Sequence, residues 1–172
     1  MVLSAPALYN PASTQDTAAL RRVFASIDAQ SCPCTYNFHM HTNHSDGQLR
    51  PDILMAQVLE IGLQGFAITD HHQTSGFYAA LDYLIYWSKQ PQNANRPVPQ
   101  LWTGMEITAQ LLDVEVHILG YGFDPQHPAI APYIIGTAPQ GAMAQADRVI
   151  AAFQQAGGLT VLAHPARYRK DR

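Results

Sequence analysis

Two histidines one residue apart, His39 and His41, end an apolar-leaning run and most constrain what this chain can fold into. Alternate side chains of a β-strand lie on the same face, so both imidazoles are expected to point the same way. Asp46 follows in a Ser-Asp-Gly turn, and the stretch Asp70–His72 adds another carboxylate and two more imidazoles. Together these residue types predict a metal site.

Apolar runs alternate with amphipathic stretches along the chain, which predicts repeated strand–helix units. Strands are expected over residues 34–41, 65–69, 100–108, 111–121 and 159–163. Helices are expected over residues 15–29, 52–61, 77–89 and 142–156. This order predicts an α/β protein with a mostly parallel sheet or barrel, whose functional groups collect at the carboxyl ends of the strands.

Most of the candidate metal ligands lie at or just after the ends of these strands. They are His39, His41, Asp46, His71, Glu106, His117 and His164. Glu106 can bridge two ions, because a carboxylate can use both of its oxygens. His117 is preferred to Glu115, which shares its strand face. A ligand set of this kind without cysteine suits Zn, Mn or Fe.

Other polar residues near the cluster are expected to have different roles. Asp70 is expected to orient an imidazole, and it completes a catalytic set with His39, His41 and Glu106. His44 and His72 are expected to face solvent or to support a ligand. His127 is assigned no role. The Cys32-Pro33-Cys34 stretch is expected to carry two reduced cysteines into the first strand, with a redox or metal role as the alternative.

The sequence contains no glycine-rich phosphate loop, no G-x-S-x-G elbow and no paired Cys/His arrangement. A water molecule activated by metal ions is therefore the expected nucleophile. Arg167 follows the His164-Pro165 pair and is expected to bind a substrate phosphate. The alternative is a surface arginine in a basic tail that continues through Lys170.

The 172 residues are 47% hydrophobic and 13% charged, with a net charge of −3, which predicts one soluble domain. Residues 1–33 are expected to form an N-terminal arm and helix, and residues 34–172 the metal-dependent domain. The charge argues against binding to duplex DNA. No run approaches the roughly 18 apolar residues of a membrane helix, and the first residues make a poor signal peptide, so the cytoplasm is expected.

Five sequence motifs, in this order, resemble those of the PHP (polymerase and histidinol phosphatase) superfamily. They are HMHTNHSDG, ITDHH, GMEI, HILGYG and VLAHPARY. Within that superfamily they are most similar to the branch of nucleoside 3′,5′-bisphosphate phosphatases and 5′-to-3′ exoribonucleases. The resemblance covers residues from about Asn37 to Tyr168.

The resemblance implies a distorted (β/α)7 barrel with up to three divalent ions at the strand ends. By motif, one ion would be held by His39, His41 and Glu106. A second would be held by Glu106, His117 and His164, and a third by Asp46 with His71. The 34–172 segment would then be the N-terminal portion of the PHP phosphoesterase domain.

The sequence departs from the family pattern in two places. Only residues 124–156 separate the HILG and AHP motifs, so the lid over the substrate is expected to be reduced. No late Asp-x-His pair precedes Arg172, which predicts an incomplete barrel at the C-terminus with residual metal binding. An open barrel exposes sheet edges and apolar surface, so low stability or a homo-oligomer is expected.

The expected function is a metal-dependent phosphoesterase acting on phosphate monoesters of small nucleotides. Nucleoside 3′,5′-bisphosphates and short oligoribonucleotides are the expected substrates. Histidinol-phosphate phosphatase is the alternative among enzymes, because it would share the metal ligands and differ only in pocket contacts. A metal-binding PHP module without activity is the alternative from another class.

Overall fold

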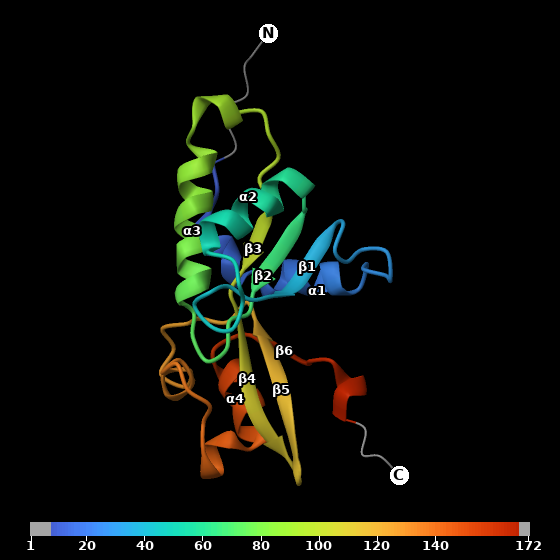
Figure 1. Cartoon of the computed structure of the whole chain (residues 1–172), viewed down its shortest axis with the longest axis vertical. Helices are drawn as coiled ribbons and strands as arrows, with labels where there is room; N and C mark the ends of the chain where they lie inside the picture. Colours follow the sequence, from blue (N-terminus) through green and yellow to red (C-terminus); the bar gives the residue numbers. More distant parts are fainter. Residues whose placement is uncertain (1–7, 169–172) are drawn as a thin grey trace.

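A computed structural model describes residues 8–168 of the chain, and the strands among them form two sheets (Figure 1). The first sheet has the order β1-β2-β3 and is parallel. Its strands are β1 (Tyr36–Met40), β2 (Gly65–Ile68) and β3 (Gln100–Trp102). The second sheet has the order β4-β5-β6 and is antiparallel. Its strands are β4 (Gly104–Leu111), β5 (Val114–Tyr121) and β6 (Leu159–Leu162).

The first sheet is covered by α2 (Pro51–Ile61) and α3 (Ser75–Ser88). Proline fits the first turn of α2, and Gly62 ends the helix in a left-handed conformation with φ of 79°. All four residues of β2 are buried, as expected for a strand covered on both faces. Phe66, Ile68 and Leu84 are fully buried in the core between this sheet and its helices.

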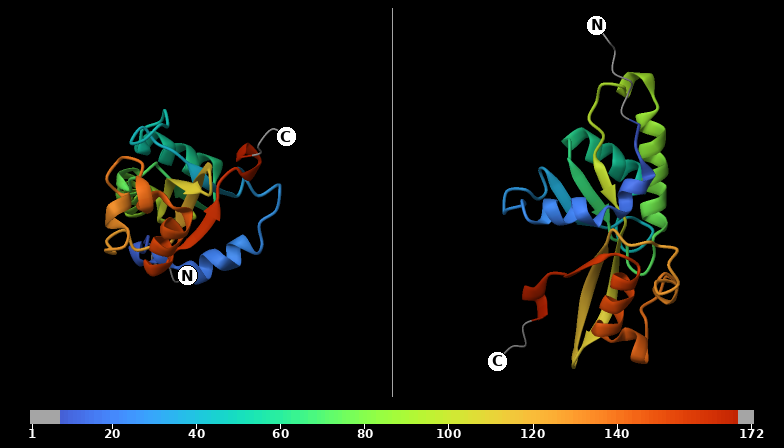
Figure 2. Two further views of the ribbon diagram at one scale, coloured as in Figure 1. Left: turned by 90° about the horizontal axis from the view of Figure 1, so that it is seen from below. Right: turned by 180° about the vertical axis from the view of Figure 1, so that it is seen from behind.

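The second sheet is covered by α4 (Ala146–Gln155), which Figure 2 shows lying against β4 and β5. Val149 and Phe153 of the helix are fully buried in its core. The helix expected from residue 142 begins later, because residues 141–144 form a 3₁₀ turn and Gln145 is extended with ψ of 132°.

The N-terminal helix α1 (Thr17–Phe24) is shorter than expected and packs at the junction of the sheets. Asp16 caps it by accepting a hydrogen bond from the Ala19 N–H at 2.8 Å, after a 3₁₀ turn at Pro11–Gln15. Leu20 is fully buried against Trp102 and Tyr121. The first part of the expected N-terminal arm, residues 1–7, lies outside the described residues.

The expected strand over residues 100–108 is wrong, because the chain changes sheets at Thr103. The Thr103 N–H donates to the Thr14 carbonyl at 3.0 Å, and its carbonyl accepts from Gly122 at 2.8 Å. Gly104 then passes so close to the Ile68 carbonyl that an added Cβ would lie 2.4 Å from that oxygen. This close approach places the end of the first sheet against the start of the second.

The expectation of a mostly parallel sheet or barrel is also wrong for the second half of the described chain. Only Leu112 and Asp113 join β4 to β5, and so short a connection can link only antiparallel strands. Within residues 8–168 the two sheets do not close into a barrel, and β1 and β6 are edge strands. None of the helices in this range is long and apolar enough to span a membrane.

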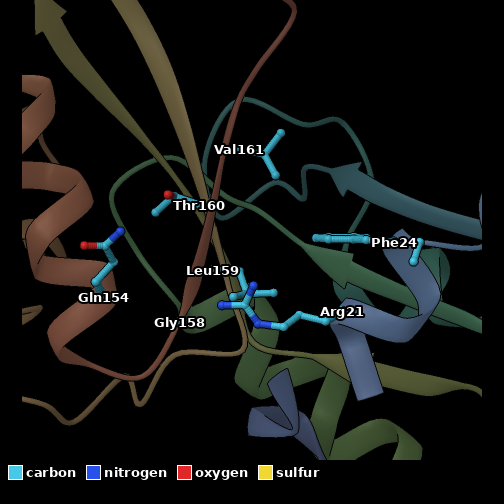
Figure 3. A pocket seen from close by; sticks show the side chains of 8 residues that line it. Arg21, Phe24, Gln154, Gly158, Leu159, Thr160 and Val161 are labelled. Atoms are coloured by element: carbon cyan, nitrogen blue, oxygen red, sulfur yellow. The ribbon is translucent and has the colours of Figure 1, made fainter. Parts of the chain in front are cut away.

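A cavity of about 550 Å³ lies between β6 and α1 (Figure 3). Arg21 and Phe24 of α1 line it together with Gln154, Thr160 and Val161. None of the expected metal ligands lines this cavity. The candidate site lies instead at the junction between the sheets.

Replacing Leu20 by alanine tests whether α1 is an integral part of the fold. We expect the free energy of unfolding to fall by about 3 kcal/mol, because the substitution leaves a cavity in a fully buried position. Chemical denaturation of Leu20→Ala and of the control Leu112→Ala, at an 88% exposed position, measures this. Equal denaturation midpoints for the two variants would show that residues 8–33 are a loosely attached arm.

Candidate metal centre

The candidate site is built around the carboxylate of Glu106, which is only 1% exposed. Its Oε2 lies 2.9 Å from His39 Nε2 and 2.8 Å from His41 Nε2. Its Oε1 lies 2.8 Å from His117 Nδ1 and 3.4 Å from His164 Nε2. Both carboxylate oxygens are therefore surrounded by imidazole nitrogens that come from both sheets.

Local backbone structure explains why these side chains meet. β1 ends at Met40, so His39 and His41 lie on either side of its last residue and their ring centroids are 5.2 Å apart. β2 ends at Ile68, and His71 beyond it forms an isolated parallel bridge with Glu106. The expectation that Glu106 lies at a strand end is wrong, because it is the third residue of β4.

Asp46 extends the cluster on the side of the loop that follows β1. Its Oδ1 lies 2.5 Å from His41 Nδ1, and its Oδ2 lies 3.6 Å from His71 Nε2. His71 Nε2 is also 3.7 Å from Glu106 Oε2. His41 and His71 thus connect the two carboxylates.

Among residues 8–168, three overlapping groups of side chains place their donor atoms within 4.8 Å of one another. The groups are His39–His41–Glu106, His41–Asp46–His71 and His71–Glu106–His117. His164 lies beside the third group through its contact with Glu106. The structure therefore brings together every residue that the sequence nominated as a metal ligand, and their metal-binding roles remain a prediction.

The residues present fit divalent metal ions. His41 Nε2 is buried and, despite lying 2.8 Å from Glu106 Oε2, is not aligned for a hydrogen bond with any described residue. A buried polar atom without a hydrogen bond calls for another partner, and an ion would supply one. Imidazole nitrogens and carboxylate oxygens without a thiolate suit Zn, Mn or Fe.

The pKa values of the metal-free cluster reflect the close contacts between imidazoles and carboxylates. Burial alone would raise the pKa of Glu106, but His39 and His41 hold it far below its usual range. Burial lowers the pKa of His41, yet the Glu106 and Asp46 carboxylates overcome this effect and raise it to about 9. Burial lowers the pKa of His71. His41 therefore carries a proton at pH 7 when no ion is bound.

The structure changes the expected surroundings of two other polar residues, Asp70 and His72. Asp70 is expected from the sequence to orient an imidazole, but the hydrogen bonds that it accepts within the described residues come from Thr42 and Ser45 rather than from a histidine ring. His72 is 6% exposed, with Nε2 3.2 Å from Thr108 Oγ1, so it does not face solvent. Burial lowers the pKa of His72 to about 4, which keeps this imidazole neutral.

Tyr168 is a supporting residue that sequence reasoning missed. Its hydroxyl oxygen accepts a hydrogen bond from the His117 N–H at 2.9 Å and lies 2.9 Å from His164 Nδ1. It therefore links His117 of β5 to His164, which follows β6. Arg167, next to it, is exposed, and its expected phosphate contact remains a prediction. The expected basic tail continues through Lys170, outside the described residues.

Comparison with known proteins places the chain in a family. The model of the PHP domain matches residues 37–162, and the chain belongs to the PHP domain family. This confirms the resemblance of the motifs.

Several curated relatives are similar to this chain in sequence. The 5′-3′ exoribonuclease Rnm of Salmonella typhimurium is 33% identical over 110 residues, which are 64% of this chain and 35% of the relative. The 3′,5′-nucleoside bisphosphate phosphatase of Chromobacterium violaceum is 29% identical over 121 residues, which are 70% of this chain and 39% of the relative. The match thus spans less than two fifths of the length of either relative.

Solved structures show a similar fold at low sequence identity. An amidohydrolase from Chromobacterium violaceum, solved with sulfate and without metal, gives a TM-score of 0.63 at 20% identity, covering 80% of this chain and 69% of that one. A protein from Bifidobacterium adolescentis described as a metal-dependent phosphoesterase gives 0.61 at 22% identity, covering 81% and 72%. These likenesses show that the chain shares its fold with both proteins.

Replacing Glu106 by glutamine tests whether its carboxylate holds metal. Two of the three ligand groups contain Glu106, so we expect the variant to lose the ions of those groups and to keep the His41–Asp46–His71 group. Metal content per chain after dialysis against Mn²⁺, measured by mass spectrometry, gives the result. His127→Gln, outside the cluster, is the control, and unchanged metal content in Glu106→Gln would contradict the assignment.

Metal affinity should depend on pH, because an ion must displace the proton on His41. The pKa of His41 is about 9 in the metal-free chain, and metal ligation requires the neutral imidazole. We therefore expect affinity to rise with pH between 7 and 9, by up to about tenfold per unit when one proton is released. Titration calorimetry in buffers of different ionisation enthalpy measures the released protons. Binding without proton release at pH 7 would count against this arrangement.

Proposed function

We propose that this chain is a metal-dependent phosphoesterase that hydrolyses phosphate monoesters of small nucleotides. The observation that carries the proposal is the arrangement of five imidazoles around the buried Glu106 carboxylate. Relatives named as a nucleoside bisphosphate phosphatase and as exoribonucleases support the choice of nucleoside 3′,5′-bisphosphates and short oligoribonucleotides as substrates.

The ligand groups are proposed to hold two or three divalent ions (Mn, Zn or Fe). Bound ions would lower the pKa of a water molecule and neutralise charge on a phosphoryl oxygen. The chain contributes the positioning, because the two oxygens of the Glu106 carboxylate face different imidazoles and could each bind an ion. Sharing of this carboxylate would keep neighbouring ions close enough to act on one phosphate.

Substrate is proposed to approach from the side of His39 and His164. Their side chains are 36% and 30% exposed, whereas Glu106 is almost fully covered. The two rings are stacked with centroids 5.8 Å apart, so they border the same opening. The Arg167 N–H donates to the His164 carbonyl at 2.9 Å, which places Arg167 near this opening. We propose that its guanidinium binds the substrate phosphate.

Phosphate release from adenosine 3′,5′-bisphosphate in the presence of Mn²⁺ tests the proposed activity. We expect turnover by the unmodified chain and at least a hundredfold lower kcat/KM in His41→Ala, because His41 belongs to two of the ligand groups. Metal content of both proteins is measured alongside. Bound metal with no turnover would contradict the proposal and would favour a metal-binding module.

The same assay tests the role of Arg167. Loss of a charge-assisted hydrogen bond to phosphate in Arg167→Ala is expected to raise KM by roughly tenfold. Arg22→Ala, another exposed arginine, is the matched control. Equal KM values in the two variants would show that Arg167 does not bind the substrate phosphate.

A further inference from the structure

Asp70 is a buried carboxylate beside the candidate metal centre, and the proposed function assigns it no part. Asp70 follows β2 and is 1% exposed. Its Oδ1 accepts hydrogen bonds from the Thr42 N–H at 2.7 Å and the Ser45 hydroxyl at 2.6 Å, and its Oδ2 accepts one from the Thr42 hydroxyl at 2.7 Å. A buried carboxylate is costly unless it is fully hydrogen-bonded, so this segment is held in one arrangement.

The residues that Asp70 binds are sequence neighbours of candidate ligands. Thr42 follows His41 and Ser45 precedes Asp46. Asp70 itself precedes His71. Each member of the His41–Asp46–His71 group is therefore adjacent in sequence to one member of the Asp70 network.

Further hydrogen bonds close the loop around Thr42. Its carbonyl accepts from the Ser45 N–H at 3.1 Å and from the Gly47 N–H at 2.9 Å. Its hydroxyl oxygen also accepts from the His44 N–H at 3.1 Å. Asp70 thus binds the residue about which the whole ligand-bearing loop is organised.

The first turn of α3 packs tightly against this network. Gly76 is buried, and a Cβ added there would lie 1.9 Å from Asp70 Oδ2 and 2.7 Å from Thr42 Oγ1. Only glycine fits at this position without displacing the carboxylate. The Asp70 carboxylate is therefore held in place from two sides. α3 packs against it, and Thr42 and Ser45 of the loop after β1 donate hydrogen bonds to it.

We propose that Asp70 is a positioning residue that preorganises the His41–Asp46–His71 group for one metal ion. The inference rests on the proposed metal-dependent function of the site. Asp70 does not touch the ion; it holds the two segments that carry the ligands at a fixed separation. Hydrogen-bonded partners behind metal ligands typically change metal affinity by 10–100-fold, which sets the expected effect.

Metal content per chain tests this inference without relying on activity. In Asp70→Asn and Thr42→Val, we expect the affinity for one ion to fall by roughly 10–100-fold, while the ions held through Glu106 are retained. Thr42→Ser keeps the hydroxyl that Thr42→Val removes, and this variant should bind metal as tightly as the unmodified chain. Gly76→Ala should act in the same direction as Asp70→Asn, because the methyl group would displace the Asp70 carboxylate.

Controls separate positioning from folding and from failure of the proposed function. His44→Ala changes an exposed side chain of the same loop and should keep every ion. Thermal melting of the metal-free variants reports any loss of fold. Full metal binding by Asp70→Asn, or loss of all ions together with the fold in both Thr42 variants, would overturn the inference. A parent chain that binds no metal would overturn the inference and the proposed function together.

Discussion

The burial of Glu106 among five imidazoles is the constraint on which the rest of this structure depends. A carboxylate that is 1% exposed must be compensated by positive charge or by several hydrogen bonds. In the metal-free chain a proton on His41 contributes to this compensation, and bound ions would take over that role. The Glu106 carboxylate would thereby couple the stability of the fold to the binding of metal ions.

The same carboxylate explains why two separate sheets form one unit. His39 and His41 come from the end of β1, whereas His117 and His164 come from β5 and the residues after β6. The segment after β2 joins the sheets through the backbone, because the His72 N–H donates to the Glu106 carbonyl at 3.0 Å. The candidate metal centre therefore lies at the junction of the two sheets, with ligands supplied by both.

Much of the site could be predicted from sequence because its ligands lie in short motifs. His39 and His41 are separated by one residue at the end of β1, and His71 follows the buried strand β2 after two residues, so local pattern is sufficient to find them. The antiparallel hairpin at Leu112 is not evident from the sequence, because two adjoining apolar runs look alike whether the connected strands are parallel or antiparallel. The hydrogen bonds of Asp70 and Tyr168 join residues remote in sequence, or depend on a turn, and local pattern does not reveal such contacts.

Anomalous diffraction from crystals grown with Mn²⁺ or Zn²⁺ tests the central claim most directly. The account predicts one peak beside each oxygen of the Glu106 carboxylate, near His39 and His41 on one side and near His117 on the other. A third peak is expected near Asp46 and His71, and each ion should lie about 2.0–2.3 Å from its ligand atoms. Asp70 should retain its hydrogen bonds to the loop beside them. A map without peaks near Glu106, in which the imidazoles still contact the carboxylate directly, would contradict the account.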